Sequence, residues 1–321
     1  MIEVEGLTKT FPTRKGREKI EVRAVDGVDL HVDAGEIVGF LGPNGAGKTT
    51  TLRMLTTLIR PTSGRAIVAG HDVAKDPVAV RRAIGYVSQS GSTGPEARAG
   101  EEVVDHGMLY GVSKTAATAR ACELFAELEL DGLWERKPRA MSGGQRRRLD
   151  IAMGLVHDPQ LVFLDEPTTG LDPQARANLW EHIAALRTGR GATIFLTTHY
   201  LDEADALCDR ILVIDHGRIV ASDTPDALKS QVSGDLVELT VRDPAQMGAA
   251  VAALAAARPD APPEVDGVRV SARVRDVGDR LPGLVRALDD AGVALAGIEV
   301  RRPTLDDVFL TVTGRSLRED A

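Results

Sequence analysis

Short, almost continuous runs of apolar residues alternate with longer helix-like runs over roughly the first 230 residues. The apolar runs are EIVGFLG (36–42), AIGYVSQ (83–89), LVFLDEP (161–167), ATIFLTTH (192–199) and RILVIDHG (210–217). Strands that are buried on both faces give such runs, as in a parallel sheet flanked by helices. The pattern therefore predicts an α/β domain built around a parallel sheet.

A different pattern begins after Ser233 and predicts a small α+β domain. It gives strands at 236–241, 268–274 and 294–300, an Ala-rich helix at 245–257, a helix at 280–291 and a last helix from Thr304. A ferredoxin-like fold is one arrangement that fits this order. We place the boundary in the polar run KSQVSGD, which divides the chain into domains of residues 1–232 and 233–321.

The length of 321 residues suits two domains, and aromatic residues make up only 3%, so Val, Leu, Ile and Ala must build the cores. The net charge of -8 argues against nucleic acid as the main partner, because binding a phosphate backbone needs a basic face. Cys122 and Cys208 form no C-x-x-C pair, which argues against a zinc site and favours a reducing cytosol. Neither a signal peptide nor an apolar run long enough to cross a membrane is evident.

The clearest local motif is GPNGAGKT at 42–49, which follows an apolar strand and precedes a helix-like run. Its glycines let backbone N–H groups turn toward phosphate oxygens, and the helix N-terminus adds partial positive charge. The alternative is a chance glycine-rich turn, which the strand–loop–helix context disfavours. The predicted nucleotide-binding residues of this loop are Gly42, Pro43, Asn44, Gly45, Ala46, Gly47, Lys48, Thr49 and Thr50. Lys48 is suited to reach the β- and γ-phosphates, and Thr49 to ligate Mg²⁺.

Five further motifs follow this loop in a fixed order. They are YVSQ ending at Gln89, MSGGQ (141–145), LVFLDE (161–166), TTGLD (168–172) and TTH (197–199). Together with GPNGAGKT they resemble the Walker A, Q-loop, signature, Walker B, D-loop and H-loop of ABC ATPases. The resemblance covers about residues 1 to 230. It implies a P-loop NTPase fold of the ABC cassette type, with a mixed sheet core and a helical signature subdomain, beside the small C-terminal α+β domain.

The resemblance, together with the chemistry of strand ends, assigns two acids. The run LVFL delivers Asp165 and Glu166 to the carboxyl edge of the sheet, where open α/β sheets bind ligands. Asp165 would hold Mg²⁺, and Glu166 would orient and deprotonate the attacking water. In isolation, Glu166 would more simply be a strand-end acid with no catalytic role. The family context is what favours the general base.

In the family, the signature of one subunit closes on ATP that is bound to the other. Ser142, Gly143, Gly144 and Gln145 precede a helix-like run, so Ser142 and the glycine amides are suited to hold a γ-phosphate. The resemblance thus implies a head-to-tail dimer with ATP at its interface. Asp172 resembles the acid that couples the two sites, and His199 the histidine that contacts the γ-phosphate. A lone His after a strand is more often structural, so its role rests on the family order.

Three further assignments follow from the resemblance. Gln89 resembles the residue that senses Mg²⁺ and the attacking water. Phe11 resembles the aromatic residue that stacks on adenine, with a core Phe in a strand as the alternative. The segment after Gln89, SGSTGPEARAG (90–100), has fewer apolar residues than we expect where a membrane partner docks. The run Arg146–Arg148 is interpreted as helix-surface charge rather than a nucleic-acid patch.

Two classes of ABC protein fit these motifs: the ATPase subunit of a transporter, and a soluble ABC ATPase that acts on nucleic acid or ribosomes. The single cassette and the absence of heptads and C-x-x-C motifs favour the transporter. The phrases SGGQRRRLDIA and RRPTLDDVFLTVTG (301–314) resemble the daunorubicin-resistance type of drug exporter ATPase. That resemblance implies a peripheral protein on the cytoplasmic face of the cell membrane, which uses ATP and Mg²⁺. Its expected partners are a separate transmembrane permease and a second ATPase subunit, and no nucleic acid is expected.

Overall fold

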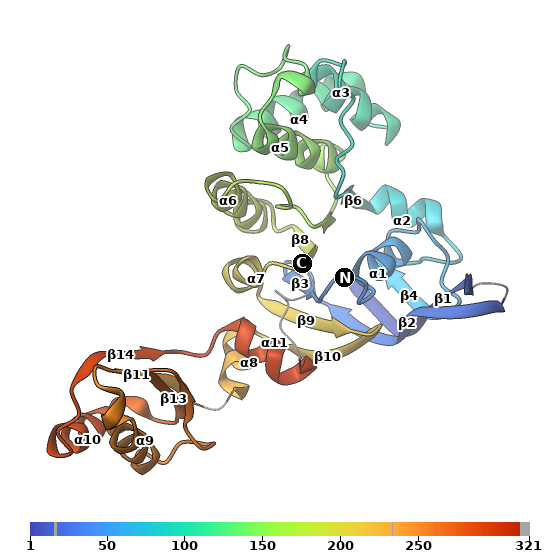
Figure 1. The fold of residues 1–321 in the computed structure, drawn as a ribbon. Coiled ribbons are helices and arrows are strands. Elements are labelled where there is room, and N and C mark those ends of the chain that lie inside the picture. Colours follow the sequence, from blue (N-terminus) through green and yellow to red (C-terminus); the bar gives the residue numbers. More distant parts are fainter. Residues whose placement is uncertain (16–17, 233, 315–321) are drawn as a thin grey trace. The chain divides into compact units, whose positions relative to one another are not determined.

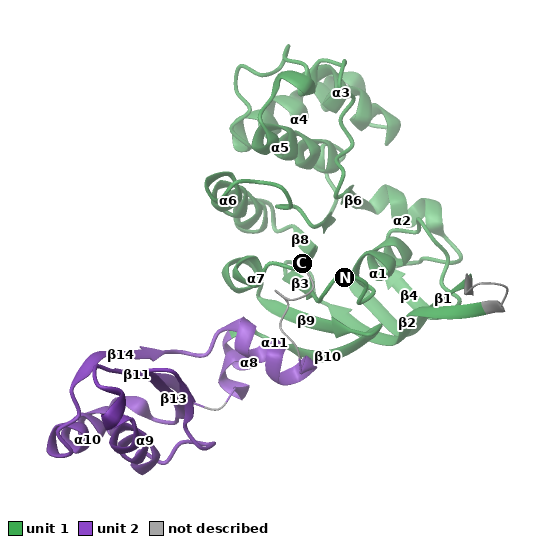
Figure 2. Cartoon of the chain, in the orientation of Figure 1, with its two compact units in different colours: residues 1–225, 316–321 green, residues 226–315 purple. Residues whose placement is uncertain are grey.

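The computed structural model describes residues 1–15, 18–232 and 234–314, which form two compact units (Figure 2). The first unit runs from Met1 to Pro225, and the second begins at Asp226. The boundary predicted from the sequence lies further along, beyond helix α8 (Pro225–Gln231), which groups here with the second unit. No helix among the described residues has the length and apolar content that crossing a bilayer requires.

The first unit is built on a six-stranded sheet with the strand order β10-β9-β3-β8-β7-β6. Its strands are β3 (Ile37–Leu41), β6 (Ile84–Val87), β7 (Leu161–Asp165), β8 (Thr193–Thr198), β9 (Arg210–Asp215) and β10 (Arg218–Asp223). All neighbours pair in parallel except β10, which is antiparallel to β9. Every residue of β3, β7 and β8 is buried. The predicted parallel sheet is therefore confirmed.

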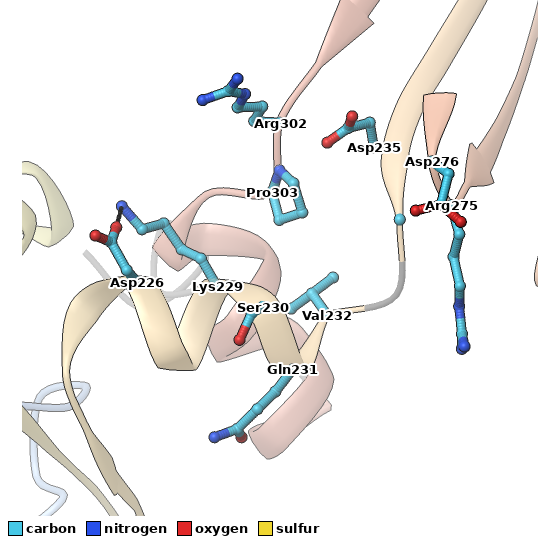
Figure 3. A pocket seen from close by; sticks show the side chains of 11 residues that line it. Asp226, Lys229, Ser230, Gln231, Val232, Asp235, Arg275, Asp276, Arg302 and Pro303 are labelled. Carbon is cyan, nitrogen blue, oxygen red and sulfur yellow. Dashed lines mark ion pairs between the residues drawn. The ribbon is translucent and has the colours of Figure 1, made fainter. Parts of the chain in front are cut away.

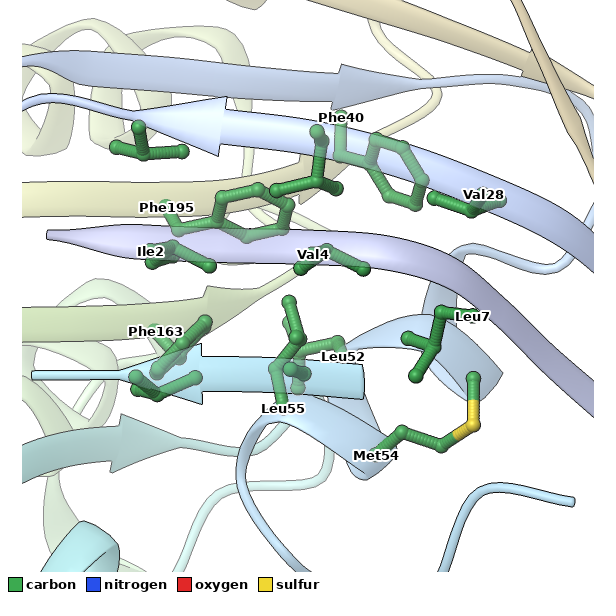
Figure 4. Packing of buried hydrophobic residues seen from close by; sticks show 14 of the residues in the cluster. Ile2, Val4, Leu7, Val28, Phe40, Leu52, Met54, Leu55, Phe163 and Phe195 are labelled. Atoms are coloured by element: carbon green, nitrogen blue, oxygen red, sulfur yellow. The ribbon is translucent and has the colours of Figure 1, made fainter. Parts of the chain in front are cut away.

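A second, antiparallel sheet has the order β2-β1-β4-β5 and packs on the first. It comprises β1 (Ile2–Lys15), β2 (Glu18–Val32), β4 (Ser63–Val68) and β5 (His71–Asp72). Figure 4 shows the shared core, in which Ile2 and Val4 of β1 lie near Phe195 of β8 and Leu52 of helix α1 (Lys48–Leu55). This core fixes β3 and α1, and with them the loop that joins the two.

The helices of the first unit form two groups. Helices α3 (Ala99–Leu109), α4 (Lys114–Glu127) and α5 (Gly143–Leu155) pack on one another and form the predicted helical subdomain (Figure 1). The other helices are α2 (Pro77–Ala83), α6 (Pro173–Arg190) and α7 (Leu201–Leu207). Because α5 also contacts β6, the subdomain joins the central sheet next to Gln89.

The second unit contains an antiparallel sheet of order β12-β13-β11-β14 with two helices packed on it. Its strands are β11 (Asp235–Val241), β12 (Glu264–Asp266), β13 (Arg269–Val274) and β14 (Leu295–Arg301), and its helices include α9 (Met247–Ala256), α10 (Val277–Asp290) and α11 (Leu305–Thr313). This order is that of a ferredoxin-like fold. Helix α11 begins with a capping box, in which Thr304 and Asp307 satisfy each other's backbone N–H groups.

The three phenylalanines at the centre of the first unit's core give a test of its packing. Phe195 is fully buried, and its ring centroid lies 5.5 Å from that of Phe40 and 5.6 Å from that of Phe163. Phe195→Ala should lower the free energy of unfolding by about 3–5 kcal/mol, because it removes a buried ring and leaves a cavity.

Urea unfolding followed by tryptophan fluorescence measures this, because both tryptophans, Trp134 and Trp180, lie in the first unit. Phe11→Ala is the matched control. Because Phe11 is 39% exposed, its replacement should lower the free energy of unfolding by only about 0.5 kcal/mol. Equal unfolding midpoints for the two variants would contradict the packing described here.

Candidate functional site

The loop between β3 and α1 is shaped by glycines that no other residue could replace. Gly47 has φ 114°, and a Cβ atom there would lie 2.6 Å from the carbonyl oxygen of Ala24. At Gly42 the added Cβ would lie 2.3 Å from the carbonyl oxygen of Ile214. The backbone therefore runs where a side chain would clash. Asn44 and Gly45 at the loop's tip are exposed, as a nucleotide-binding loop requires.

Lys48, at the start of α1, is 4% exposed and folds back on this loop. Its ammonium donates to the carbonyl oxygens of Gly42, at 2.6 Å, and Pro43, at 3.1 Å. It also lies 3.8 Å from Glu166 Oε1. Burial lowers the pKa of Lys48, whereas the charges of Glu166 and Asp165 raise it. The two carbonyl oxygens thus satisfy donors of the ammonium, and Glu166 supplies a compensating charge.

Asp165 ends strand β7 and is held by hydroxyl groups from two other elements. Its Oδ1 accepts a hydrogen bond from Thr197 Oγ1 of β8 at 2.7 Å and lies 3.5 Å from Thr49 Oγ1 of α1. Burial raises the pKa of Asp165, and the Thr197 hydrogen bond opposes that shift. The structure therefore brings together Thr49 and Asp165, two of the three residues predicted at the Mg²⁺ site; the third, Gln89, contacts Glu166.

Glu166 follows directly, in a left-handed conformation (φ 45°) that is unusual for a residue with a side chain. Its Oε2 accepts hydrogen bonds from Gln89 Nε2 at 2.8 Å and Thr169 Oγ1 at 3.1 Å, and His199 Nδ1 lies 3.4 Å away. The His199 ring lowers the pKa of Glu166 most, with Lys48 and Thr169 adding to it and burial opposing. Glu166 is thus held as a carboxylate, which is the state a general base needs.

Two helix N-termini form a second group, at a distance from the first. Ser142 caps α5 in a capping box with Gln145, and Asp172 caps α6 by accepting from the Ala175 N–H at 2.9 Å. Ser142, Gly144 and Asp172 line one open hollow of about 320 Å³. Figure 1 draws α5 apart from α1, and the capping hydrogen bonds of Ser142 and Asp172 stay at the starts of α5 and α6.

Comparisons with known proteins identify the arrangement. A family model for the ABC transporter matches residues 25–169. The daunorubicin resistance ATP-binding protein DrrA3 of Streptomyces coeruleorubidus is 44% identical over 319 residues, which cover 99% of this chain and 97% of that protein. The chain belongs to the ABC transporter family. As a member of it, the chain is an ATPase that binds ATP.

Other members of the ABC transporter family are similar over almost as much of the chain. The doxorubicin resistance ATP-binding protein DrrA of Mycobacterium tuberculosis (strain ATCC 25618 / H37Rv) is 43% identical over 97% of this chain and 93% of that protein. The Nod factor export ATP-binding protein I of Burkholderia lata is 38% identical over 92% of this chain and 93% of that protein. Because these matches span both units, the second unit also belongs to the shared architecture.

Solved structures of ABC cassettes resemble the chain in fold. A dimeric ATP-binding cassette in a post-hydrolysis state with ADP and Pi aligns with a TM-score of 0.62 at 27% identity, over 70% of this chain and 98% of that chain. The ATP binding subunit of an ABC transporter gives the same TM-score at 30% identity, over 72% and 92%. The predicted ABC cassette fold is therefore confirmed.

Two site residues of this ABC cassette were not predicted from the sequence. Thr197 donates to Asp165, and its Oγ1 also accepts from the Glu166 N–H at 3.0 Å. Thr169 donates to the Glu166 carboxylate. Both lie inside motifs that were recognised, TTH and TTGLD, but a threonine in a motif carries no charge that marks it. The pairing of β7 with β8 places Thr197 opposite Asp165, and the turn after β7 brings Thr169 back to Glu166.

The interpretation of Arg146–Arg148 as surface charge is wrong for Arg147. Its side chain is only 7% exposed, and its guanidinium donates to three backbone carbonyl oxygens. Arg146 is exposed as predicted, whereas the Arg148 side chain is only 13% exposed and pairs with Glu129 at 3.0 Å. The helical position explains the difference: Arg147 lies one turn before Ile151, on the buried face of α5.

Phe11 lies on β1 with its ring 39% exposed, and Lys9 Nζ lies 5.1 Å from the ring centroid. That exposure excludes the alternative of a core phenylalanine. The stacking of Phe11 on adenine remains a prediction.

The second unit has a larger open hollow, of about 610 Å³, beside α8 (Figure 3). Three acids and three bases line it, and two of these bases have acidic partners: Lys229 pairs with Asp226, and Arg275 with Asp260, each at 2.9 Å. The hollow therefore offers no field of a single sign for a charged ligand. Among the described residues no cluster of three or more His, Cys, Asp or Glu side chains could hold a metal ion.

Thr197 gives the test of this geometry. Thr197→Val keeps the shape of the side chain but removes the hydrogen bond that orients Asp165 and the contact with the Glu166 N–H. We expect kcat/KM for ATP hydrolysis to fall about tenfold or more, since a buried carboxylate loses its only nearby donor of this strength.

Thr197→Ser is the matched variant, because it keeps the hydroxyl and loses only a methyl group. Its kcat/KM should stay within about threefold of the wild type. If the valine and serine variants hydrolyse ATP equally well, the hydroxyl does not position Asp165.

Proposed function

We propose that this chain is the Mg²⁺-dependent ATPase subunit of an exporter that carries a drug-like or lipid-like molecule through a separate membrane protein. The observation that carries the proposal is the convergence of Lys48, Thr49, Asp165 and Glu166 at the end of the phosphate loop. Relatives named for daunorubicin or doxorubicin resistance and for Nod factor export support the class of cargo. The transported molecule is selected by the membrane partner.

The oxygen atoms at this site fit Mg²⁺. A threonine hydroxyl and a carboxylate lie together, and hard oxygen ligands are what this ion prefers. We assign Thr49 and Asp165 as its protein ligands, with Gln89 close by on Glu166. Bound there, Mg²⁺ would neutralise charge on the β- and γ-phosphates.

The chain's own residues supply the rest of the chemistry. The ammonium of Lys48, which now rests on two carbonyl oxygens, would turn to the phosphates, because an anion is a stronger partner than a neutral carbonyl. Glu166 would accept the proton of the attacking water. Gln89 and His199 already touch Glu166, so they are suited to orient it and to bind near the γ-phosphate.

A complete site would need two copies of the chain. Ser142 and the glycines after it start a helix, where anions are stabilised, yet they lie apart from the phosphate loop of the same chain. A head-to-tail homodimer would place the Ser142 group of one copy over ATP on the other. The dimeric cassette among the similar structures supports this arrangement.

A membrane-spanning permease would complete the assembly, with this chain on its cytoplasmic face. The described residues include no helix that could cross the bilayer, so the pathway for the cargo must come from another protein. The alternative, a soluble ABC ATPase acting on nucleic acid or ribosomes, has less support: the net charge is -8, and the similar proteins are named for resistance and export. We assign the second unit a structural or regulatory role rather than a catalytic one.

Glu166→Gln tests the general base and the dimer together. The amide cannot accept a proton, so kcat should fall by about 10²-fold or more while ATP still binds. ATP should then accumulate in the closed dimer, and light scattering should report a doubled mass. Lys48→Ala is the control that should bind no ATP and remain monomeric. A Glu166→Gln variant that hydrolyses ATP at the wild-type rate would exclude Glu166 as the base.

The membrane partner gives a separate test. The tagged chain should be recovered from detergent-solubilised membranes together with a protein of several membrane spans, identified by mass spectrometry. Release by high salt without detergent is expected for the chain but not for that partner. Stable recovery with ribosomes or DNA, and with no membrane protein, would support the alternative class.

A further inference from the structure

The guanidinium of Arg147, on helix α5, hydrogen-bonds to two separate backbone segments of the site. Arg147 of α5 donates to the carbonyl oxygens of Pro167 at 2.7 Å, Ser88 at 2.6 Å and Asp165 at 3.1 Å. Two of these residues flank Glu166, and the third precedes Gln89 in the chain. A planar group with five donors is the side chain that can meet acceptors in several directions at once.

One turn further along α5, Asp150 holds the other end of the Gln89 segment. Its buried carboxylate accepts hydrogen bonds from the backbone N–H groups of Ser92, at 2.7 Å, and Thr93, at 3.2 Å. Gly91 packs so closely that an added Cβ would lie 2.8 Å from Asp150 Oδ2. The segment from Ser88 to Thr93 is therefore fixed to α5 at both ends, with Gln89 between them.

The side chain of Gln89 completes this connection by donating to Glu166 at 2.8 Å. Helix α5 thus carries the signature at its N-terminus and, within its next two turns, the groups that hold both Gln89 and the backbone around Glu166. The same helix also packs on α3 of the helical subdomain. Any displacement of α5 must then move Gln89 relative to the phosphate loop.

We propose that Arg147 and Asp150 are positioning residues that hold Gln89 against Glu166 for the attack of water on ATP. This inference rests on the proposed function. Neither side chain lies among the groups assigned to the phosphates or to Mg²⁺. Their loss therefore affects the rate of the bound complex rather than the affinity for ATP. A displacement of about 1 Å at a reacting group can lower a rate by about 10²-fold, so the effect on kcat is measurable.

Steady-state ATP hydrolysis and equilibrium binding of a fluorescent ATP analogue, both with the full-length chain, separate rate from affinity. Arg147→Met should lower kcat about tenfold or more and leave the Kd within about twofold. Arg147→Lys keeps the charge, but its single ammonium cannot reach three carbonyls, so kcat should stay about fivefold or more below the wild type.

Two substitutions of Asp150 form a matched pair of variants. Asp150→Ala should lower kcat about fivefold or more, whereas Asp150→Asn keeps an acceptor oxygen for Ser92 and Thr93 and should stay within about twofold of the wild type. Because Asp150 accepts its hydrogen bonds from the Gln89 segment, Asp150→Ala should change kcat less than about twofold when Gln89→Ala is already present. A role in stability alone would not give this dependence.

Arg120→Met is the matched control. Arg120 lies on α4 of the same subdomain and pairs with Asp158 and Glu123, and it touches none of the segments around Gln89 or Glu166. Its loss should leave kcat within about twofold of the wild type.

The possible results distinguish failure of the proposed function from failure of the positioning role. A wild-type chain without ATPase activity would overturn the proposed function itself. A wild type that is active and sensitive to Lys48→Ala, with wild-type kcat in Arg147→Met, would overturn the positioning role alone. So would a fall in affinity that accounts for the whole loss of kcat/KM. If Arg147→Met does not fold, the Asp150 variants decide: equal losses in Asp150→Ala and Asp150→Asn, or full additivity with Gln89→Ala, would exclude the proposal.

Discussion

Burying a lysine beside two carboxylates is the constraint on which the rest of this structure depends. Lys48, Asp165 and Glu166 are each at most 9% exposed, so solvent does little to stabilise their charges. The protein meets that cost because the loop carbonyls accept hydrogen bonds from Lys48, the hydroxyl of Thr197 and the amide of Gln89 donate to the carboxylates, and the His199 ring lies 3.4 Å from Glu166. These partners come from β3, β6, β8 and their following loops. The shared core of the two sheets is what keeps those strands at the required distances.

The same environment shifts the pKa values of the two acids in opposite directions. Burial raises the pKa of Asp165, whereas the His199 ring and Lys48 lower the pKa of Glu166. Adjacent carboxylates whose surroundings push their pKa values apart are suited to different tasks. One residue can thus serve as a cation ligand and the next as a base, although the two follow each other in sequence. Glu166 follows the last residue of β7 in a left-handed conformation, and the two side chains meet different partners.

The sequence was sufficient for the parallel sheet, the helical subdomain, the ferredoxin-like unit and the location of Lys48, because each rests on local periodicity or on a motif. It was insufficient for Arg147 and Thr197. In sequence, the buried Arg147 looks like the exposed Arg146 beside it until the carbonyl groups that it meets are known. Those carbonyls belong to segments far away in the chain. A threonine likewise gains its meaning only from strand pairing. The domain boundary was less well defined because α8 is polar and exposed on much of its surface.

The backbone at Glu166 has a wider consequence. A left-handed conformation costs a residue with a side chain of the order of 1 kcal/mol or more, and glycine would avoid that cost. Substitution by glycine would relax the turn while removing the carboxylate. Given the role proposed for Glu166, selection or engineering for thermal resistance alone would therefore favour a more stable protein that lacks the proposed general base. At this one position, stability favours glycine and the proposed catalytic role favours glutamate, and the chain carries glutamate.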